Sequence, residues 1–219
     1  MKVFRYWLDK GVDGFRLDVF NAYFKDEQMR DNPRKKGLAR RPFEAYDHIY
    51  DISQPEMMEV VKEIRAILNE YPDRYVVGET FLEGPVYART LVGEDKFHAA
   101  FDFSFAQSPW NAKAFGKAIQ YWDALHGDEA WPNYFLNNHD LPRSATRYTQ
   151  NEDDSRLKLL ATMLLTVRGT PFIYYGEEIG MRDIKVARKN IQDPVGKRYW
   201  PFYKGRDGCR SPMQWDANI

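Results

Sequence analysis

Three acidic residues each follow a short apolar run and are the first candidates for chemistry. Asp18 stands in GFRLDV, Glu79 in VVGET and Asp140 in FLNNHD. A carboxylate at the end of an apolar strand is costly to bury unless it is paired or used in a reaction. Each one alone could equally cap the next helix or form a structural ion pair. Three of them, at the ends of three parallel strands, would converge on one face of a sheet, and this pattern favours a catalytic site.

Converging carboxylates suit the hydrolysis of a glycosidic bond. A retaining mechanism uses one carboxylate as the nucleophile and one carboxylic acid as the proton donor, with the two groups about 5–5.5 Å apart. The transition state carries positive charge, so a further negative charge nearby stabilises it. The residue types at the three strand ends therefore fit this reaction.

Apolar runs that read as buried strands alternate with segments of helical periodicity. The expected strands span residues 14–19, 75–79, 100–105, 134–138 and 171–175, and the expected helices span 55–68, 109–125 and 155–167. Ser53 is a plausible cap for the first of these helices, with Glu56 three residues later. Strands that alternate with helices predict a parallel sheet, and nearly continuous apolar strands are typical of a sheet covered on both faces.

The expected fold class is α/β, as an incomplete TIM (β/α)8 barrel. A closed barrel needs eight strands and usually about 250 residues, whereas residues 1–219 supply five expected strands. Residues 1–10 look like the end of a helix, so the chain is expected to begin within the architecture. Long polar segments, 21–53 and 180–219, follow the first and last strands, on the side where barrels build active sites.

The three acidic motifs resemble those of the α-amylase superfamily, glycoside hydrolase family 13, in the same order and spacing. The resemblance implies that Asp18 is the nucleophile, Glu79 the general acid/base and Asp140 a transition-state stabiliser. Arg16 lies two residues before Asp18, on the same side of the strand, where its charge would favour the ionised carboxylate. His139 would bind a hydroxyl of the sugar in the cleaved position.

Three other segments resemble the α-glucosidase and oligo-1,6-glucosidase branch of that family: DHIYDISQPEM, FIYYGEEIGM and RDGCRSPMQWD. The resemblance thus covers essentially the whole chain, as about the last five βα units of the barrel. It implies removal of glucose from the non-reducing end of short α-1,4- or α-1,6-linked oligosaccharides. Val19 directly follows Asp18, and valine at this position resembles the α-1,6-cleaving members. Arg143 and Arg210 are expected on the substrate side, although each could instead form a surface ion pair.

Three parts of that family have no counterpart in residues 1–219: the first motif, the small inserted domain and the C-terminal β-sandwich domain. Five strands would leave open barrel edges and exposed apolar faces. We therefore expect the isolated chain to self-associate, to be poorly soluble and to be inactive.

The composition excludes several other classes of protein. Lys plus Arg and Asp plus Glu number 32 each, so no net charge favours a nucleic acid or membrane partner. Cys209 is the single cysteine, which excludes an internal disulfide, and the expected location is cytoplasmic. No His/Cys/Asp cluster has metal-ligand spacing, so we expect no metal and no cofactor. The other histidines, His48, His98 and His126, are expected to be structural.

Three alternatives to a hydrolase remain. A glucosyl-transferring relative, of the sucrose- or trehalose-forming type, would keep the same carboxylates and use a sugar as the acceptor. A non-catalytic carbohydrate-binding or transporter-associated relative would have lost its acids, and all three are present here. A doubly wound nucleotide-binding domain would need a GxGxxG turn after a strand, and none follows any expected strand.

Overall fold

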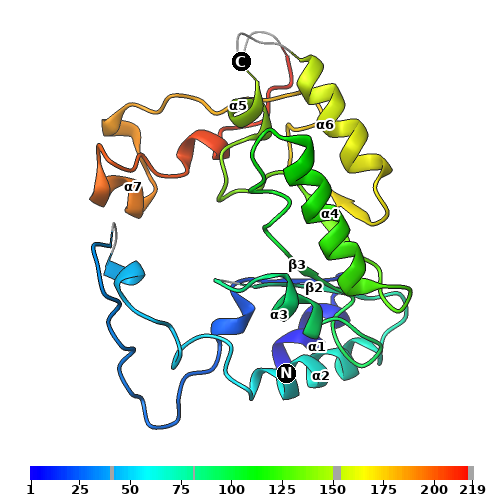
Figure 1. Cartoon of the computed structure of the whole chain (residues 1–219). Helices are drawn as coiled ribbons and strands as arrows, with labels where there is room; N and C mark the ends of the chain where they lie inside the picture. Colours follow the sequence, from blue (N-terminus) through cyan, green and yellow to red (C-terminus); the bar gives the residue numbers. More distant parts are fainter. Residues whose placement is uncertain (40–41, 81, 150–153, 217–219) are drawn as a thin grey trace. The chain divides into compact units, whose positions relative to one another are not determined.

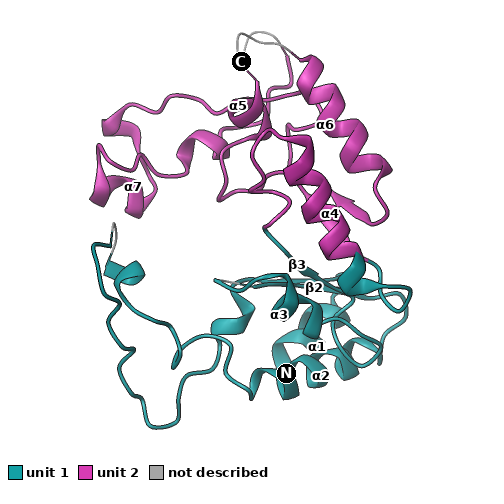
Figure 2. Cartoon of the chain, in the orientation of Figure 1, with its two compact units in different colours: residues 1–103, 124–131 teal, residues 104–123, 132–219 magenta. Residues whose placement is uncertain are grey.

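The computed structural model describes residues 1–39, 42–80, 82–149 and 154–216, which fold as two compact α/β units (Figures 1 and 2). Unit 1 consists of residues 1–103 and 124–131, and unit 2 of residues 104–123 and 132–219. Each unit contains its own parallel sheet.

Unit 1 contains a three-stranded parallel sheet in the order β1–β2–β3. The strands are β1 (Gly14–Leu17), β2 (Tyr75–Glu79) and β3 (Ala99–Phe101). Leu17 pairs with Gly78, and Glu79 pairs with Phe101. The carboxyl ends of β1 and β2 therefore lie side by side, and the residues that follow them share one edge of the sheet.

Within the described residues, three α-helices lie wholly in unit 1: α1 (Lys2–Asp9), α2 (Met57–Leu68) and α3 (Pro85–Thr90). α1 contacts α2, and α3 contacts β3 (Figure 1). The apolar stripe of α2 is buried, as its spacing predicts. The expected cap is wrong, because the backbone at Ser53 is left-handed (φ 55°) and its hydroxyl accepts a hydrogen bond from Asn21 Nδ2 at 2.9 Å. Ser53 thus closes the preceding loop, and the helix begins four residues later.

An aromatic cluster fixes the backbone immediately before Glu79. A Cβ at Gly78 would lie 2.9 Å from the ring of Phe97, closer than a side chain tolerates. Because glycine stands there, Phe97 packs beside the strand and meets Phe20 edge to face, with ring centroids 4.7 Å apart. Both rings are fully buried, so the carboxyl end of β2 is supported by a rigid apolar base.

Unit 2 contains a two-stranded parallel sheet of β4 (Asn133–Phe135) and β5 (Thr170–Phe172). Its helices are α5 (Ser144–Tyr148), α6 (Ser155–Thr166), α7 (Pro194–Tyr199) and the part of α4 (Ala112–His126) up to residue 123. Asn111 caps α4, since its Oδ1 accepts from the amides of Lys113 and Ala114 at 2.9 and 3.1 Å.

The expected α/β class with parallel strands is confirmed, but four strands are shorter than expected. β1 ends at Leu17, two residues early, and β3, β4 and β5 have three residues each. Leu136 follows β4 without belonging to the ladder and is nevertheless only 2% exposed. An apolar run in the sequence indicates which residues are buried. Because buried residues continue past the last hydrogen bond of the β-ladder, the predicted strands are too long. Compared with the predicted helix 109–125, α4 begins three residues later and ends one residue later; α6 begins at residue 155 as predicted and ends one residue before 167.

Candidate active site

In unit 1 the structure brings Asp18 and Glu79 together around one guanidinium group. Asp18 directly follows β1, and Glu79 is the last residue of β2. Nη1 of Arg16 pairs with Oδ1 of Asp18, and Nη2 lies 2.7 Å from Oε2 of Glu79. The parallel register of β1 and β2 creates this arrangement, because it aligns the two strand ends.

The two carboxylates lie in different environments. Glu79 is 6% exposed, whereas the side chain of Asp18 is 69% exposed. Burial raises the pKa of Glu79, and hydrogen bonding to Asp18 and its negative charge raise it further. The amide of Val19 and the charge of Arg16 act in the opposite direction. A carboxyl that keeps its proton to higher pH suits a general acid, and an accessible carboxylate suits a nucleophile.

Val19 connects the two strand ends through its backbone. Its φ of 40° and ψ of 44° lie in the left-handed region, which is costly for a β-branched residue. In this conformation its N–H donates to Oε2 of Glu79, with a nitrogen–oxygen distance of 3.1 Å. A strained backbone of this kind persists only where the surroundings enforce it. Here the strained conformation directs the N–H of Val19 to the buried carboxyl of Glu79.

In unit 2, Asp140 lies among three cationic or potentially cationic side chains. Its Oδ1 accepts from Arg206 Nη1 at 2.6 Å and from Arg210 Nη2 at 3.0 Å. Its Oδ2 lies 3.3 Å from Nε2 of His139. The amide of Asp140 donates to Oδ1 of Asn138 at 2.9 Å, which closes a turn after β4. The side chain of Asp140 is one third exposed, so it can also meet a ligand.

Two of the remaining predicted residues adjoin Asp140, and one does not. Arg210 donates from Nε to the carbonyl of His139 at 2.8 Å, and the side chain of His139 is half-exposed. Arg143 is only 1% exposed, and its Nη1 donates to the carbonyl of Tyr175 at 2.6 Å. Its guanidinium also lies over the rings of Tyr174 and Tyr175. Arg143 therefore fixes the segment after β5 instead of facing an open surface.

The sequence pattern did not single out Arg206. It begins the RDGCR segment, but its partner Asp140 lies 66 residues earlier in the chain. Nothing in the spacing of the residues indicates that pairing. The only available signal was its place in a segment that also contains Arg210.

Two of the other histidines, His98 and His48, have structural partners. Nδ1 of His98 accepts from the amide of Val76 at 3.1 Å, and burial lowers the pKa of His98. Nδ1 of His48 lies 3.0 Å from a carboxylate oxygen of Asp51. Among the described residues, no group of three or more His, Cys, Asp or Glu could hold a metal ion. Within the same ranges, no helix is both long and apolar enough to cross a membrane.

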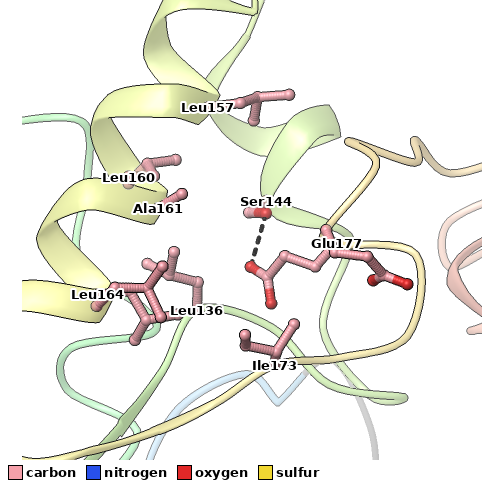
Figure 3. A pocket seen from close by; sticks show the side chains of 10 residues that line it. Leu136, Ser144, Leu157, Leu160, Ala161, Leu164, Ile173 and Glu177 are labelled. Atoms are coloured by element: carbon pink, nitrogen blue, oxygen red, sulfur yellow. Dashed lines mark hydrogen bonds between the residues drawn. The ribbon is translucent and has the colours of Figure 1, made fainter.

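Unit 2 also contains an apolar pocket of about 230 Å³ between α6 and the ends of β4 and β5. Figure 3 shows Glu177 directed toward Ser144, beside Leu136 and the leucines of α6. Oε1 of Glu177 accepts from Ser144 Oγ at 3.1 Å and from Asn137 Nδ2 at 3.2 Å. Burial raises the pKa of Glu177. Through these contacts the carboxyl of Glu177, after β5, connects to residues on either side of Asp140 in the chain.

The family model described as the catalytic domain of alpha amylase matches residues 1–219. A probable alpha-glucosidase of Rhizobium meliloti is 36% identical over 233 residues, which cover 99% of this chain and 42% of that protein. An oligo-1,6-glucosidase of Parageobacillus thermoglucosidasius is 32% identical over 254 residues, covering 98% and 43%.

Solved structures agree with this similarity. The alpha-glucosyl transfer enzyme XgtA superposes with a TM-score of 0.88 at 32% identity, over 96% of this chain and 41% of that one. An isomaltulose synthase variant from Erwinia rhapontici NX5, in complex with sucrose, superposes with a TM-score of 0.82 at 27% identity, over 100% and 44%. The chain thus spans less than half the length of these relatives, and its parallel strands and helices are those of an incomplete (β/α)8 barrel.

Proposed function

Because the chain belongs to the alpha-amylase catalytic-domain family, we propose that the protein carrying it is a retaining α-glucosidase. It removes glucose from the non-reducing end of short α-linked oligosaccharides. The observation that carries this proposal is the pairing of Arg16 with both Asp18 and Glu79. The carboxylate of Asp18 is exposed, whereas the carboxyl of Glu79 is buried and has a raised pKa. The named activities of the bacterial relatives support the substrate class.

The proposed reaction has two steps. In the first, Glu79 gives its proton to the glycosidic oxygen while Asp18 attacks the anomeric carbon, so the leaving sugar departs and a covalent glucosyl ester forms. In the second, Glu79 takes a proton from water, and the water oxygen attacks the same carbon and releases Asp18. Glucose leaves with its α-configuration, and both carboxyl groups return to their starting states.

Arg16 has a defined part in this cycle. Its charge favours the ionised form of the attacking carboxylate and lowers the pKa of Glu79, which burial alone would raise further. After the first step Asp18 is esterified and has lost its charge, so the pKa of Glu79 falls. Glu79 is then a carboxylate when it must act as a base, as a residue that alternates between acid and base requires.

Asp140 is proposed to stabilise the transition state and to hold sugar hydroxyls, with His139 and Arg210 beside it. The support is local to unit 2: a partly exposed carboxylate held by Arg210 and adjoining His139. The proposal includes cleavage of both α-1,4 and α-1,6 linkages. The relatives include an oligo-1,6-glucosidase, and Val19 is the residue type that α-1,6-cleaving members have at this position.

Glucosyl transfer is the second candidate. It is favoured by the similarity to XgtA and to an isomaltulose synthase, whose names describe transfer and sugar synthesis. The covalent intermediate is the same in both reactions, and only the acceptor differs. A sugar hydroxyl would then take the place of water in the second step.

The test is to incubate the protein carrying this chain with isomaltose and with maltose, and to follow the products by proton NMR. We expect α-glucose to appear before mutarotation. Asp18→Asn and Glu79→Gln should each lower the rate about 10³-fold or more. Asp13→Asn is the matched control, because Asp13 lies just before β1 and its side chain is 95% exposed.

Three results would count against the proposal: initial release of β-glucose, unchanged rates in both variants, or no turnover of either disaccharide. Formation of trisaccharides or of a sucrose isomer, with little free glucose, would instead favour the transferase. The two candidates are thus separated in a single experiment.

A further inference from the structure

Arg206 lies between two carboxylates of unit 2, one buried and one partly exposed. Its Nε donates to Oδ2 of Asp193 at 2.9 Å, and its Nη2 donates to Oδ1 of Asp193 at 3.2 Å. Its Nη1 donates to Oδ1 of Asp140 at 2.6 Å. One planar guanidinium therefore joins Asp140 to a residue 53 positions later in the chain.

The buried end of this link is held by its own backbone contacts. The side chain of Asp193 has no exposed surface. Its Oδ1 accepts from the amide of Val195 at 3.2 Å, which caps α7, and its Oδ2 accepts from the amide of Arg206 at 2.9 Å. Asp193 is thus fixed by backbone donors. Because its carboxylate is held in place, it restricts the orientation of the guanidinium that it binds.

The residue before Arg206 also supports this geometry. Gly205 has a φ of 82°, a conformation that L side chains rarely adopt. A Cβ at Gly205 would lie 3.1 Å from both Cβ and Oδ2 of Asp193. Glycine therefore allows the backbone to pass close enough for the amide and the side chain of Arg206 to reach the same carboxylate.

A bidentate hydrogen bond of this kind fixes the orientation of the guanidinium as well as its distance from the carboxylate. A guanidinium held through Nε and Nη2 lies in the plane of the carboxylate, so its remaining Nη1 points in one direction. Here that direction is toward Asp140. Arg210 also reaches Asp140, but in the described part of the chain no second acidic partner holds its guanidinium, and its Nε donates to the carbonyl of His139.

We propose that Arg206 is a positioning residue which, held by buried Asp193, sets the orientation of the Asp140 carboxylate for its contact with the sugar. This inference rests on the proposed function, in which Asp140 meets the substrate. The hydrogen bonds also act on ionisation: the Arg206 guanidinium lowers the pKa of Asp193, and hydrogen bonds to Asp193 and Asp140 raise the pKa of Arg206, although burial opposes both shifts. The Arg206–Asp193 ion pair therefore stays charged throughout the neutral range.

A purely structural link makes a different prediction. If Arg206 only joined the loop at residue 206 to α7, its loss would lower stability and leave the turnover of folded protein unchanged. If it positions Asp140, its loss lowers kcat, because Asp140 acts most strongly in the transition state.

The experiment uses the protein that carries this chain, with p-nitrophenyl α-D-glucopyranoside as the probe. For Arg206→Gln and Asp193→Asn we expect kcat to fall about 10- to 100-fold, as misplacement of a reacting group by 1 Å does. KM should change less than about threefold, since ground-state binding is retained. Arg206→Lys should recover only part of the loss, because an ammonium group cannot grip two carboxylates in one plane.

Arg182→Gln is the matched control, since Arg182 is also about one third exposed, belongs to unit 2 and pairs with Asp154 at 3.2 Å. Its kcat should stay within about twofold of the parent value, the range expected for a surface pair. A kcat for Arg206→Gln within that same range, in protein that is still folded, would overturn the inference.

A second readout does not depend on turnover. In protein labelled with 15N-arginine, the Nε–H hydrogen of Arg206 should exchange slowly with solvent. In Asp193→Asn its NMR signal should move to the chemical shifts of solvent-exposed arginines. Asp140→Asn should move the Nη signals of Arg206 and leave the Nε–H protected. If Asp140→Asn moves nothing, the link between the two residues is refuted. If the parent protein shows no turnover, the proposed function fails, and the NMR result alone decides whether Arg206 is held between the two carboxylates.

Discussion

Nη2 of Arg16 lies 2.7 Å from Oε2 of Glu79, so a buried carboxyl of unit 1 faces a permanent positive charge. Even so, the pKa of Glu79 is raised, because burial outweighs the attraction of Arg16 and the hydrogen bond from Val19. Hydrogen bonding and repulsion from Asp18 add to the rise. The ionisation of Glu79 thus depends on the charge of its neighbour, which is the property that a residue alternating between acid and base needs.

The charge of Asp18 should be measurable in the titration of Glu79. Asp18→Asn removes a negative charge, so the pKa of Glu79 should fall toward its ordinary value of 4.5. The measurement is a carbon-13 NMR titration of the glutamate carboxyl signals, with Glu79→Gln to assign the resonance. Asp13→Asn is the control, because the exposed Asp13 pairs with Arg74 at 3.2 Å and should leave the titration unchanged. An equal or higher pKa of Glu79 in Asp18→Asn would contradict the prediction.

The left-handed backbone at Val19 reverses the usual ranking of alanine and glycine. Alanine at φ 40° keeps the strain and glycine does not, so Val19→Gly should be more stable than Val19→Ala by about 1 kcal/mol. The free energies of unfolding are compared by urea denaturation. Val77 in β2 provides the control pair, since Val77→Ala should there be more stable than Val77→Gly by about 0.5–1 kcal/mol. If alanine is preferred at both positions, the backbone at Val19 is not strained.

Glu177 should make the stability of unit 2 depend on pH. Its pKa is raised in the folded state above the ordinary value of 4.5, so the folded protein binds the proton more tightly than the unfolded chain does. That stabilisation is complete below pH 4.5 and is lost as pH rises through the folded pKa. The Tm of the parent minus that of Glu177→Gln should therefore decrease as pH rises from 4.5 toward 8. Glu178→Gln, at an exposed neighbour, is the control. A difference that is constant or increases with pH would count against this account.

The isolated chain is expected to self-associate, and the surface of α6 offers one place to test this. Leu159 and Leu165 on this helix are 60% and 59% exposed, which is unusual for leucines of a helix whose other face is buried. Light scattering after size-exclusion chromatography should show oligomers, and Leu159→Lys with Leu165→Lys should shift the chain toward the monomer. Thr162→Lys, the control, adds one positive charge to α6 without removing an apolar group. A monomeric parent chain that hydrolyses isomaltose would refute both the self-association and the inactivity expected for it.

The sequence alone determined the elements whose signals are local. The run YVVGE predicted β2 with its correct ends, and an acid closing an apolar run predicted Glu79 as a site residue. The spacing of Arg16 and Asp18 by two residues placed both on one side of a strand, and the structure confirms their pairing. Such features depend on the strand period and on the cost of burying charge, and both can be read over a few residues.

Only the tertiary structure decided which distant groups meet and how deeply each is buried. Arg206 pairs with Asp140 across 66 positions, and Arg143, expected on the substrate side, is buried and donates to the carbonyl of Tyr175 after β5. The left-handed turn at Ser53, which replaces the expected helix cap, depends likewise on a hydrogen bond from Asn21. Pairings of this kind result from the packing of whole elements. Because local periodicity is compatible with many such packings, the sequence could predict the carboxylates of the candidate site but not the arginine that holds one of them.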